Sequence, residues 1–174
     1  MIATRLDLLR ELSAGMDLYG LPDPLERLPA TLNEPVSGTQ STIHGDLNLE
    51  NALVGPGDFI WLIDFAMTRD GHTLFDFAHL EAEIIAQVIA PQLASPQDFL
   101  DMLEQADSHG AAYLYTLLSA LRDIASRCLF NPSQPREYRL AAYMACLGAL
   151  KFANLEAHQK HLLLLNAAYL SRLL

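Results

Sequence analysis

Cysteine and long apolar runs are both scarce in this sequence. The 174 residues contain two cysteines, Cys128 and Cys146, which form neither a metal-binding pattern nor a disulfide framework. Both lie in apolar helical stretches, so we expect buried thiols. No run reaches the roughly 18 apolar residues that a membrane-spanning helix needs. The start, MIATRLDLLREL, carries charge at helical spacing and has no apolar signal core. These absences predict a cytoplasmic protein without a membrane partner.

Basic residues are nearly missing from the middle of the chain. Residues 41–107 hold twelve acidic groups and one basic group, Arg69, whereas residues 108–174 carry a net charge of +4. Nucleic-acid binding needs a basic footprint, so the overall charge of −10 argues against a nucleic-acid partner. An acidic middle attracts cations, either metal ions or amine-bearing substrates. A solvated acidic surface without any binding role explains the same excess of acidic residues.

The periodicity of apolar residues predicts a mostly helical chain with a small β region. Ser95, Pro96 and Asp98 form a helix start signal, and GPGD between two apolar runs predicts a β-hairpin. The run FIWLI is apolar throughout, as expected of a strand covered on both faces. The expected strands are 41–44, 52–54 and 59–63, and the expected helices are 2–19, a short one from Leu25, 74–90, 95–106, 110–129, 136–156 and 158–173.

These elements predict an α+β, mostly α fold, in which a β-hairpin is set against a helical bundle. No repeat or linker divides the chain, so residues 1–174 are expected to form one domain.

Polar side chains gather around the predicted hairpin. The segment STIHGDLNLENALV places Asp46 just after a β-like run and Asn51 at the entry to the next strand. Asp64 follows the second hairpin strand, in LIDFA. Because a hairpin brings its entrance and exit together, Asp46, Asn51 and Asp64 are expected to converge. Carboxylate and amide oxygens are the ligands that Mg²⁺ prefers, and a further acid can accept a proton from a hydroxyl nucleophile. The sequence therefore predicts a phosphoryl-transfer site.

The order of these residues resembles a kinase catalytic loop. The kinase template H-R-D-x-x-x-x-N followed by D-F-G is matched here by HGDLNLEN from His44 to Asn51 and by DFA from Asp64. With glycine in place of arginine, the motif is similar to that of the aminoglycoside phosphotransferase and choline kinase family. The later GHTLFDFAHLE resembles the segment that follows the metal aspartate in that family. The resemblance covers residues 40–90 by motif and the remainder by helical architecture.

The resemblance implies a role for each matching residue. Asp46 corresponds to the base that receives the proton of the acceptor hydroxyl, and Asn51 and Asp64 correspond to the ligands of Mg²⁺ on ATP. His44 corresponds to a histidine that braces the loop, and Asp76 to a residue that anchors it. The implied reaction is phosphoryl transfer from ATP to a hydroxyl of a small molecule, which the acidic middle suggests is amine-bearing.

The family's nucleotide-gripping features are not found in this sequence. The 43 residues before His44 contain no lysine, and no G-x-G-x-x-G occurs. Neutral Asn48, a further supporting position of the loop, stands where protein kinases carry a basic residue. The sequence thus resembles the C-terminal lobe of a small-molecule kinase with the N-terminal lobe absent.

Three explanations of that absence remain open at this point. The chain is a fragment of a longer enzyme, a lobe that uses a partner protein's phosphate cradle, or a non-catalytic interaction module of a multidomain bacterial signalling or conflict protein. Retention of Asp46, Asn51 and Asp64 favours the first, because clustered acids cost stability without a metal. Two carboxylates across a hairpin would also suit glycoside hydrolysis, but that hypothesis leaves Asn51 unexplained. Each residue taken alone would be a turn former or helix cap.

Overall fold

Helices make up most of the molecule. The computed structural model describes residues 2–104 and 111–174. Within those ranges the helices are α1 (Ile2–Ser13), α2 (Pro24–Thr31), α3 (Phe75–Glu83), α4 (Pro96–Leu103), α5 (Ala112–Ser126), α6 (Arg136–Ala149) and α7 (Ala157–Arg172). A π-helical stretch, η3 (Ile84–Ile89), continues α3. The same ranges contain three short 3₁₀ turns, which are η1 (Leu49–Asn51), η2 (Phe65–Met67) and η4 (Ala90–Gln92).

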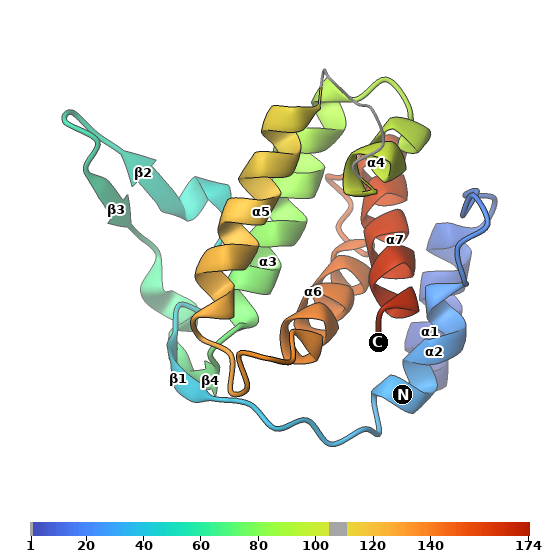
Figure 1. The fold of residues 1–174 in the computed structure, drawn as a ribbon, viewed down its shortest axis with the longest axis horizontal. Coiled ribbons are helices and arrows are strands. Elements are labelled where there is room, and N and C mark those ends of the chain that lie inside the picture. Colours follow the sequence, from blue (N-terminus) through green and yellow to red (C-terminus); the bar gives the residue numbers. More distant parts are fainter. Residues whose placement is uncertain (1, 105–110) are drawn as a thin grey trace.

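The strands form two small antiparallel sheets. Strand β1 (Gln40–Ile43) pairs with β4 (Arg69–His72), and β2 (Ala52–Val54) pairs with β3 (Ile60–Leu62). The second pair is the hairpin that the sequence predicts, and it projects away from the helices (Figure 1). The prediction of an α+β, mostly helical chain is confirmed.

The core lies where α6 and α7 pack against each other and α6 packs against α3 (Figure 1). Many apolar side chains at these contacts are buried, as Leu147 and Leu163 illustrate. Tyr143 on α6 is buried too, and its hydroxyl donates a hydrogen bond of 2.6 Å to the Pro24 carbonyl, which ties α2 to the bundle. None of the helices in the described ranges is long and apolar enough to cross a membrane.

A buried polar network joins four helices. Glu81 on α3 is fully buried and receives two hydrogen bonds from Arg122 on α5, at 3.0 and 2.7 Å. The Tyr138 hydroxyl of α6 donates to the same carboxylate at 2.6 Å, and the Asn166 amide of α7 donates at 3.2 Å. Burial raises the pKa of Glu81, but the charge of Arg122 and these hydrogen bonds outweigh it and hold the pKa below its usual value. The network fixes the position of α3 in the bundle.

Most element predictions match in type, and the boundaries differ. The first helix ends at Ser13 rather than near residue 19, and Gly15 has φ +79°, a conformation that ends helices easily. Ser95 caps α4 as predicted, in a capping box with Asp98. The expected end of that helix at 106 and the expected start of the next at 110 lie outside the described residues. The helix expected over 136–156 ends at Ala149.

Two features differ from the sequence predictions more deeply. Strand β4 was not anticipated, because RDGH has neither apolar alternation nor β-branched residues. The expectation that FIWLI is covered on both faces is wrong for the described part of the chain. All five side chains from Phe59 to Ile63 are exposed, Ile60 by 66%. Cys146 is buried as expected, whereas Cys128 is only partly buried.

Candidate functional site

The loop that follows β1 is held by Asp76, at the start of α3. One carboxylate oxygen of Asp76 accepts a hydrogen bond from the His44 amide at 2.7 Å, and the other accepts one from the Gly45 amide at 3.0 Å. Gly45 has φ +83°, and a Cβ atom there would collide with the Met67 carbonyl oxygen. Only glycine suits this turn, because it needs both a left-handed backbone and close backbone approach. The turn therefore fixes the direction in which the chain reaches Asp46.

Asn48 and Asn51 organise the second half of the loop. The Asn48 side-chain oxygen caps η1 by accepting hydrogen bonds from the Glu50 and Asn51 amides, both at 3.0 Å. Asn51 is buried, and its side-chain amide donates to the Asp46 carbonyl at 2.9 Å. The two ends of the loop are thus tied together through Asn51.

The exit of the hairpin lies beside this loop. The Ile63 amide donates to the Asn51 carbonyl at 3.0 Å, and the Ile63 carbonyl accepts a hydrogen bond of 2.8 Å from the His44 imidazole Nε2. His44 is buried and its ring contacts the Phe65 ring, at a centroid distance of 4.9 Å. Asp64 lies between Ile63 and Phe65 in the sequence, and both of these neighbours contact His44.

Asp64 has an unusual backbone and an exposed side chain. Its φ and ψ are 59° and 61°, in the left-handed region that is uncommon outside glycine. Among the residues that the structure describes, its carboxylate has no hydrogen-bond or ion-pair partner. The side-chain nitrogen of Asn51 donates to the Asp46 carbonyl, so the side-chain oxygen of Asn51 is not needed for that contact.

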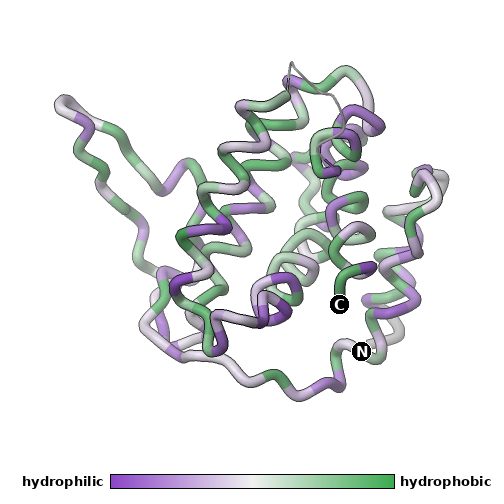
Figure 2. The backbone as a smooth tube through the Cα atoms, viewed as in Figure 1, coloured by the Kyte–Doolittle hydropathy of each residue, from purple (hydrophilic) through white to green (hydrophobic). Residues whose placement is uncertain are grey.

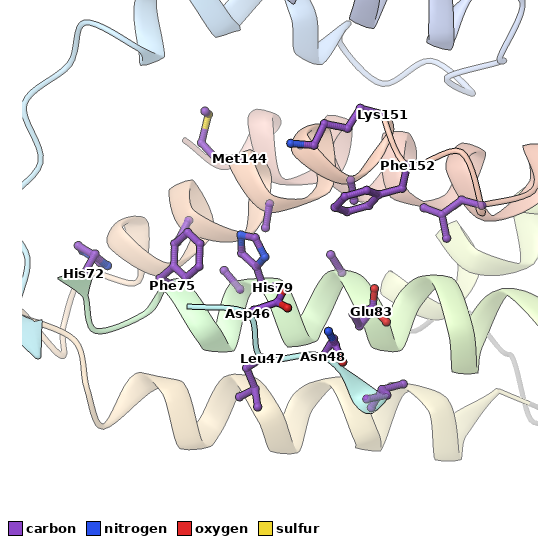
Figure 3. Close-up of a pocket in the computed structure, with 18 of the residues that line it drawn as sticks. Asp46, Leu47, Asn48, His72, Phe75, His79, Glu83, Met144, Lys151 and Phe152 are labelled. Carbon is purple, nitrogen blue, oxygen red and sulfur yellow. The ribbon is translucent and has the colours of Figure 1, made fainter. Parts of the chain in front are cut away.

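A large groove opens next to the loop. It has a volume of about 1140 Å³ and lies between α3, α6 and residues 46–50. Figure 3 shows Asp46 beside His79, with Lys151 and Phe152 across the groove. The charged, polar and aromatic residues that line it are Arg5, Asp46, Asn48, Glu50, His72, Phe75, His79, Glu83, Gln87, Glu137, Lys151, Phe152 and Asn154. Asp46 and Asn48 line the groove, whereas Asn51 and Asp64 do not, so whether the side chains of 46, 51 and 64 face one ion stays a prediction.

Acidic side chains of the loop raise the pKa of an acidic side chain on the groove-facing side of α3. Burial raises the pKa of Glu83, and the negative charges of Glu50 and Asp46 raise it further. Burial lowers the pKa of His79, although Asp76 and Asp46 oppose that effect. The His79 ring also stacks on Phe75, with ring centroids 4.1 Å apart. This wall therefore favours a ligand that brings positive charge.

Several of these groove residues were not identified from the sequence. Lys151 lies more than a hundred positions after Asp46, and nothing in its own surroundings marks it as functional. Its ammonium group lies 5.5 Å from the centre of the Phe152 ring. Glu83 and His79 occupy ordinary helical positions, so only their place on the groove-facing side of α3 distinguishes them. Their helical spacing of four was the sole available signal.

The oxygen-bearing residues of the loop suit a hard cation. No group of three histidine, cysteine, aspartate or glutamate side chains in the described ranges is arranged to hold a metal ion. The Asn51 amide oxygen and the Asp64 carboxylate are hard oxygen donors, and Mg²⁺ takes few protein ligands and keeps several waters. These two residues fit Mg²⁺ chemically.

Comparison with known proteins gives a family for the chain. Residues 2–156 match the family described as ternary complex associated domain 9, TCAD9. The chain belongs to this family. The match takes in the loop, the hairpin and α3 to α6, so the loop, hairpin and groove residues of the candidate site lie within the TCAD9 region. No curated protein and no solved structure matches the TCAD9 chain.

Proposed function

We propose that this chain is the helical lobe of a kinase-like phosphotransferase, which transfers the γ-phosphoryl group of ATP to a hydroxyl of a small molecule. The observation that carries the proposal is the bracing of the loop. Asp76 holds its turn, Asn51 holds the Asp46 carbonyl, and the Asp46 carboxylate lines the groove. An acid positioned by backbone contacts at the mouth of a groove is suited to act as a general base.

Asp46 is the proposed base. Its side chain has no hydrogen-bond partner within the described ranges, so it is free to accept a proton from an acceptor hydroxyl. In the proposed step the hydroxyl oxygen attacks the γ-phosphorus while its proton passes to the Asp46 carboxylate. The bond between the γ-phosphorus and the bridging oxygen breaks, and ADP leaves with the electron pair.

Asn51 and Asp64 are the proposed ligands of Mg²⁺. The ion, when bound with ATP, would neutralise charge that develops on the phosphate oxygens. The chain's own contribution is to hold Asn51 and Ile63 together through the hydrogen bond of 3.0 Å between their backbones. That contact keeps Asp64 near Asn51.

The groove is the proposed site of the acceptor. Asp46, Glu50 and Glu83 give one wall negative charge, which favours an acceptor that carries an amine as well as a hydroxyl. Phe75 and Phe152 supply apolar and aromatic surface for the body of such a molecule.

Grip on the nucleotide phosphates is assigned to another lobe or a partner protein. The sequence has no glycine-rich phosphate loop, and its two lysines are Lys151 and Lys160. The isolated lobe is therefore expected to bind Mg²⁺–ATP weakly and to turn over slowly.

An interaction module without catalysis is the second candidate. The family description names association with a ternary complex. The exposed apolar hairpin also favours protein binding, because soluble proteins rarely leave such surfaces uncovered. This candidate does not require the residues of the loop.

Titration of Mg²⁺–ATP tests the catalytic proposal. Binding is measured by calorimetry with and without Mg²⁺, for the unaltered chain, Asp64→Ala and Asp58→Ala. Asp58 is a matched control, because it too is an exposed hairpin aspartate with a positive φ, of 60°. We expect Mg²⁺-dependent binding that Asp64→Ala abolishes and Asp58→Ala preserves. Absence of Mg²⁺-dependent binding, or equal losses in both variants, would leave the interaction module as the better account.

The role of Asp46 is tested separately from binding. Asp46→Asn keeps the shape of the side chain but removes its basicity. ATP turnover with an amino-alcohol acceptor should fall about 100-fold or more, while the Kd for Mg²⁺–ATP stays unchanged. Unchanged turnover would exclude Asp46 as the base.

A further inference from the structure

The β2–β3 hairpin is an apolar element that the described residues leave exposed. It projects from the helical body, and both of its strands consist largely of hydrophobic residues (Figures 1 and 2). The exposed side chains are Leu53, Val54, Phe59, Ile60, Trp61 and Leu62. An isolated two-stranded hairpin is marginally stable in water, and contiguous apolar patches mark interaction sites.

Apolar side chains occupy both faces of the hairpin. Because side chains alternate along a strand, Leu53, Phe59 and Trp61 share one face, and Val54 and Ile60 share the other. The rings of Phe59 and Trp61 lie 6.3 Å apart, centre to centre. A half-buried surface sheet has one polar face. The composition of this hairpin is that of a strand pair buried on both sides, and the described residues do not bury it.

Among the strands that the structure describes, none pairs with the outer backbone edges of the hairpin. Asn51 with Ile63, and Gly55 with Phe59, are joined by backbone hydrogen bonds across the hairpin. Because hydrogen-bonded and non-hydrogen-bonded pairs alternate in an antiparallel ladder, Ile60 and Leu62 turn their backbone groups outward. Strand β3 is exposed in all three of its residues. A further strand can therefore add to its outer edge.

Charge indicates which kind of strand fits. Residues 41–68 contain four acidic groups and no lysine or arginine, and Asp58 and Asp64 flank β3. A second copy of the hairpin would bring negative charge against negative charge, which disfavours association. We infer that β3 is a docking edge for an extended, apolar segment of a partner protein that is flanked by lysine or arginine. This inference does not rest on phosphoryl transfer.

Trp61 provides the assay, because it is the single tryptophan of the chain. The probes are the peptide KKVTVIVKK and its acidic counterpart EEVTVIVEE, added to the full chain. We expect the basic peptide to shift Trp61 emission to the blue, to reduce its quenching by acrylamide, and to saturate. The acidic peptide should bind at least about tenfold more weakly.

A matched pair of variants tests the location. Ile60→Lys should abolish the response, whereas Ile124→Lys, which changes another exposed isoleucine on α5, should leave it intact. No response to the basic peptide, equal binding of both peptides, or equal effects of both variants would overturn the inference. Trp61 that becomes protected as the chain concentration rises, with dimers in sedimentation, would assign the edge to a second copy instead and overturn it too.

Discussion

Replacement of Arg122 by methionine tests how the bundle positions α3. Arg122 donates two hydrogen bonds to Glu81, which is fully buried. Removal of one partner of a buried ion pair typically costs about 3–5 kcal/mol, because the other charge is left unpaired. The Arg122 side chain is 27% exposed, so water can reach the vacated position and the lower end applies. We expect a loss of about 3 kcal/mol in the free energy of unfolding.

Urea unfolding followed by far-UV circular dichroism measures this loss. Trp61 fluorescence is unsuitable, because the exposed hairpin does not report on the helices. With a denaturant slope of about 2 kcal/mol per molar urea, the midpoint should fall by about 1.5 M. The control is Arg127→Met, which removes an exposed pair with Asp123 at 3.3 Å. That change should cost less than about 0.5 kcal/mol. Equal losses in the two variants would refute the reasoning.

The pH dependence gives a second check on the same network. The pKa of Glu81 is lower in the folded chain than its usual value of 4.5. The ionised network therefore contributes its full stability above about pH 4.5, and the contribution is lost as the pH falls through the folded-state pKa. The difference between the unaltered chain and Arg122→Met should shrink below pH 4.5. A difference that grows on acidification would contradict the assignment.

Three further substitutions are informative. Gly45→Ala should lower the free energy of unfolding by at least about 1 kcal/mol, because the turn has a positive φ and no space for a Cβ atom; an unchanged urea midpoint would contradict this. Glu83→Gln should raise the free energy of unfolding at pH 7, because burial and the charges of Glu50 and Asp46 raise the pKa of Glu83 and the ionised side chain therefore destabilises the folded chain above that pKa. A gain in stability seen only at acidic pH would contradict this. Ser95→Ala should cost about 1 kcal/mol by removing the cap of α4, and thermal unfolding without any shift would exclude that role.

Local signals in the sequence predict much of the fold. The GPGD turn and the Ser95 start signal each depend on a few neighbouring residues, and both are present in the structure. The cover of the hairpin could not be predicted in the same way. FIWLI has the composition of a buried strand, but composition cannot say whether the covering surface belongs to the same chain.

In the candidate site too, residues placed by local turns could be predicted, whereas residues placed by helix packing could not. The spacing of Asp46 and Asn51 reflects a local turn, and the structure joins them by one hydrogen bond. Lys151 reaches the groove only because α6 packs on α3, so no local pattern identifies it. Asp64 has its left-handed backbone because the chain must turn directly after β3.

Paramagnetic Mn²⁺ substituted for Mg²⁺ tests most directly whether one divalent ion is held by the loop and the hairpin exit. In the presence of ATP, Mn²⁺ below one equivalent should broaden the amide resonances of Asn51 and Asp64 first, and that of Asp46 next. The Asp58 resonance at the hairpin turn should stay sharp. Broadening centred on Glu50 and Glu83, or none at any of these amides, would contradict the proposed magnesium site.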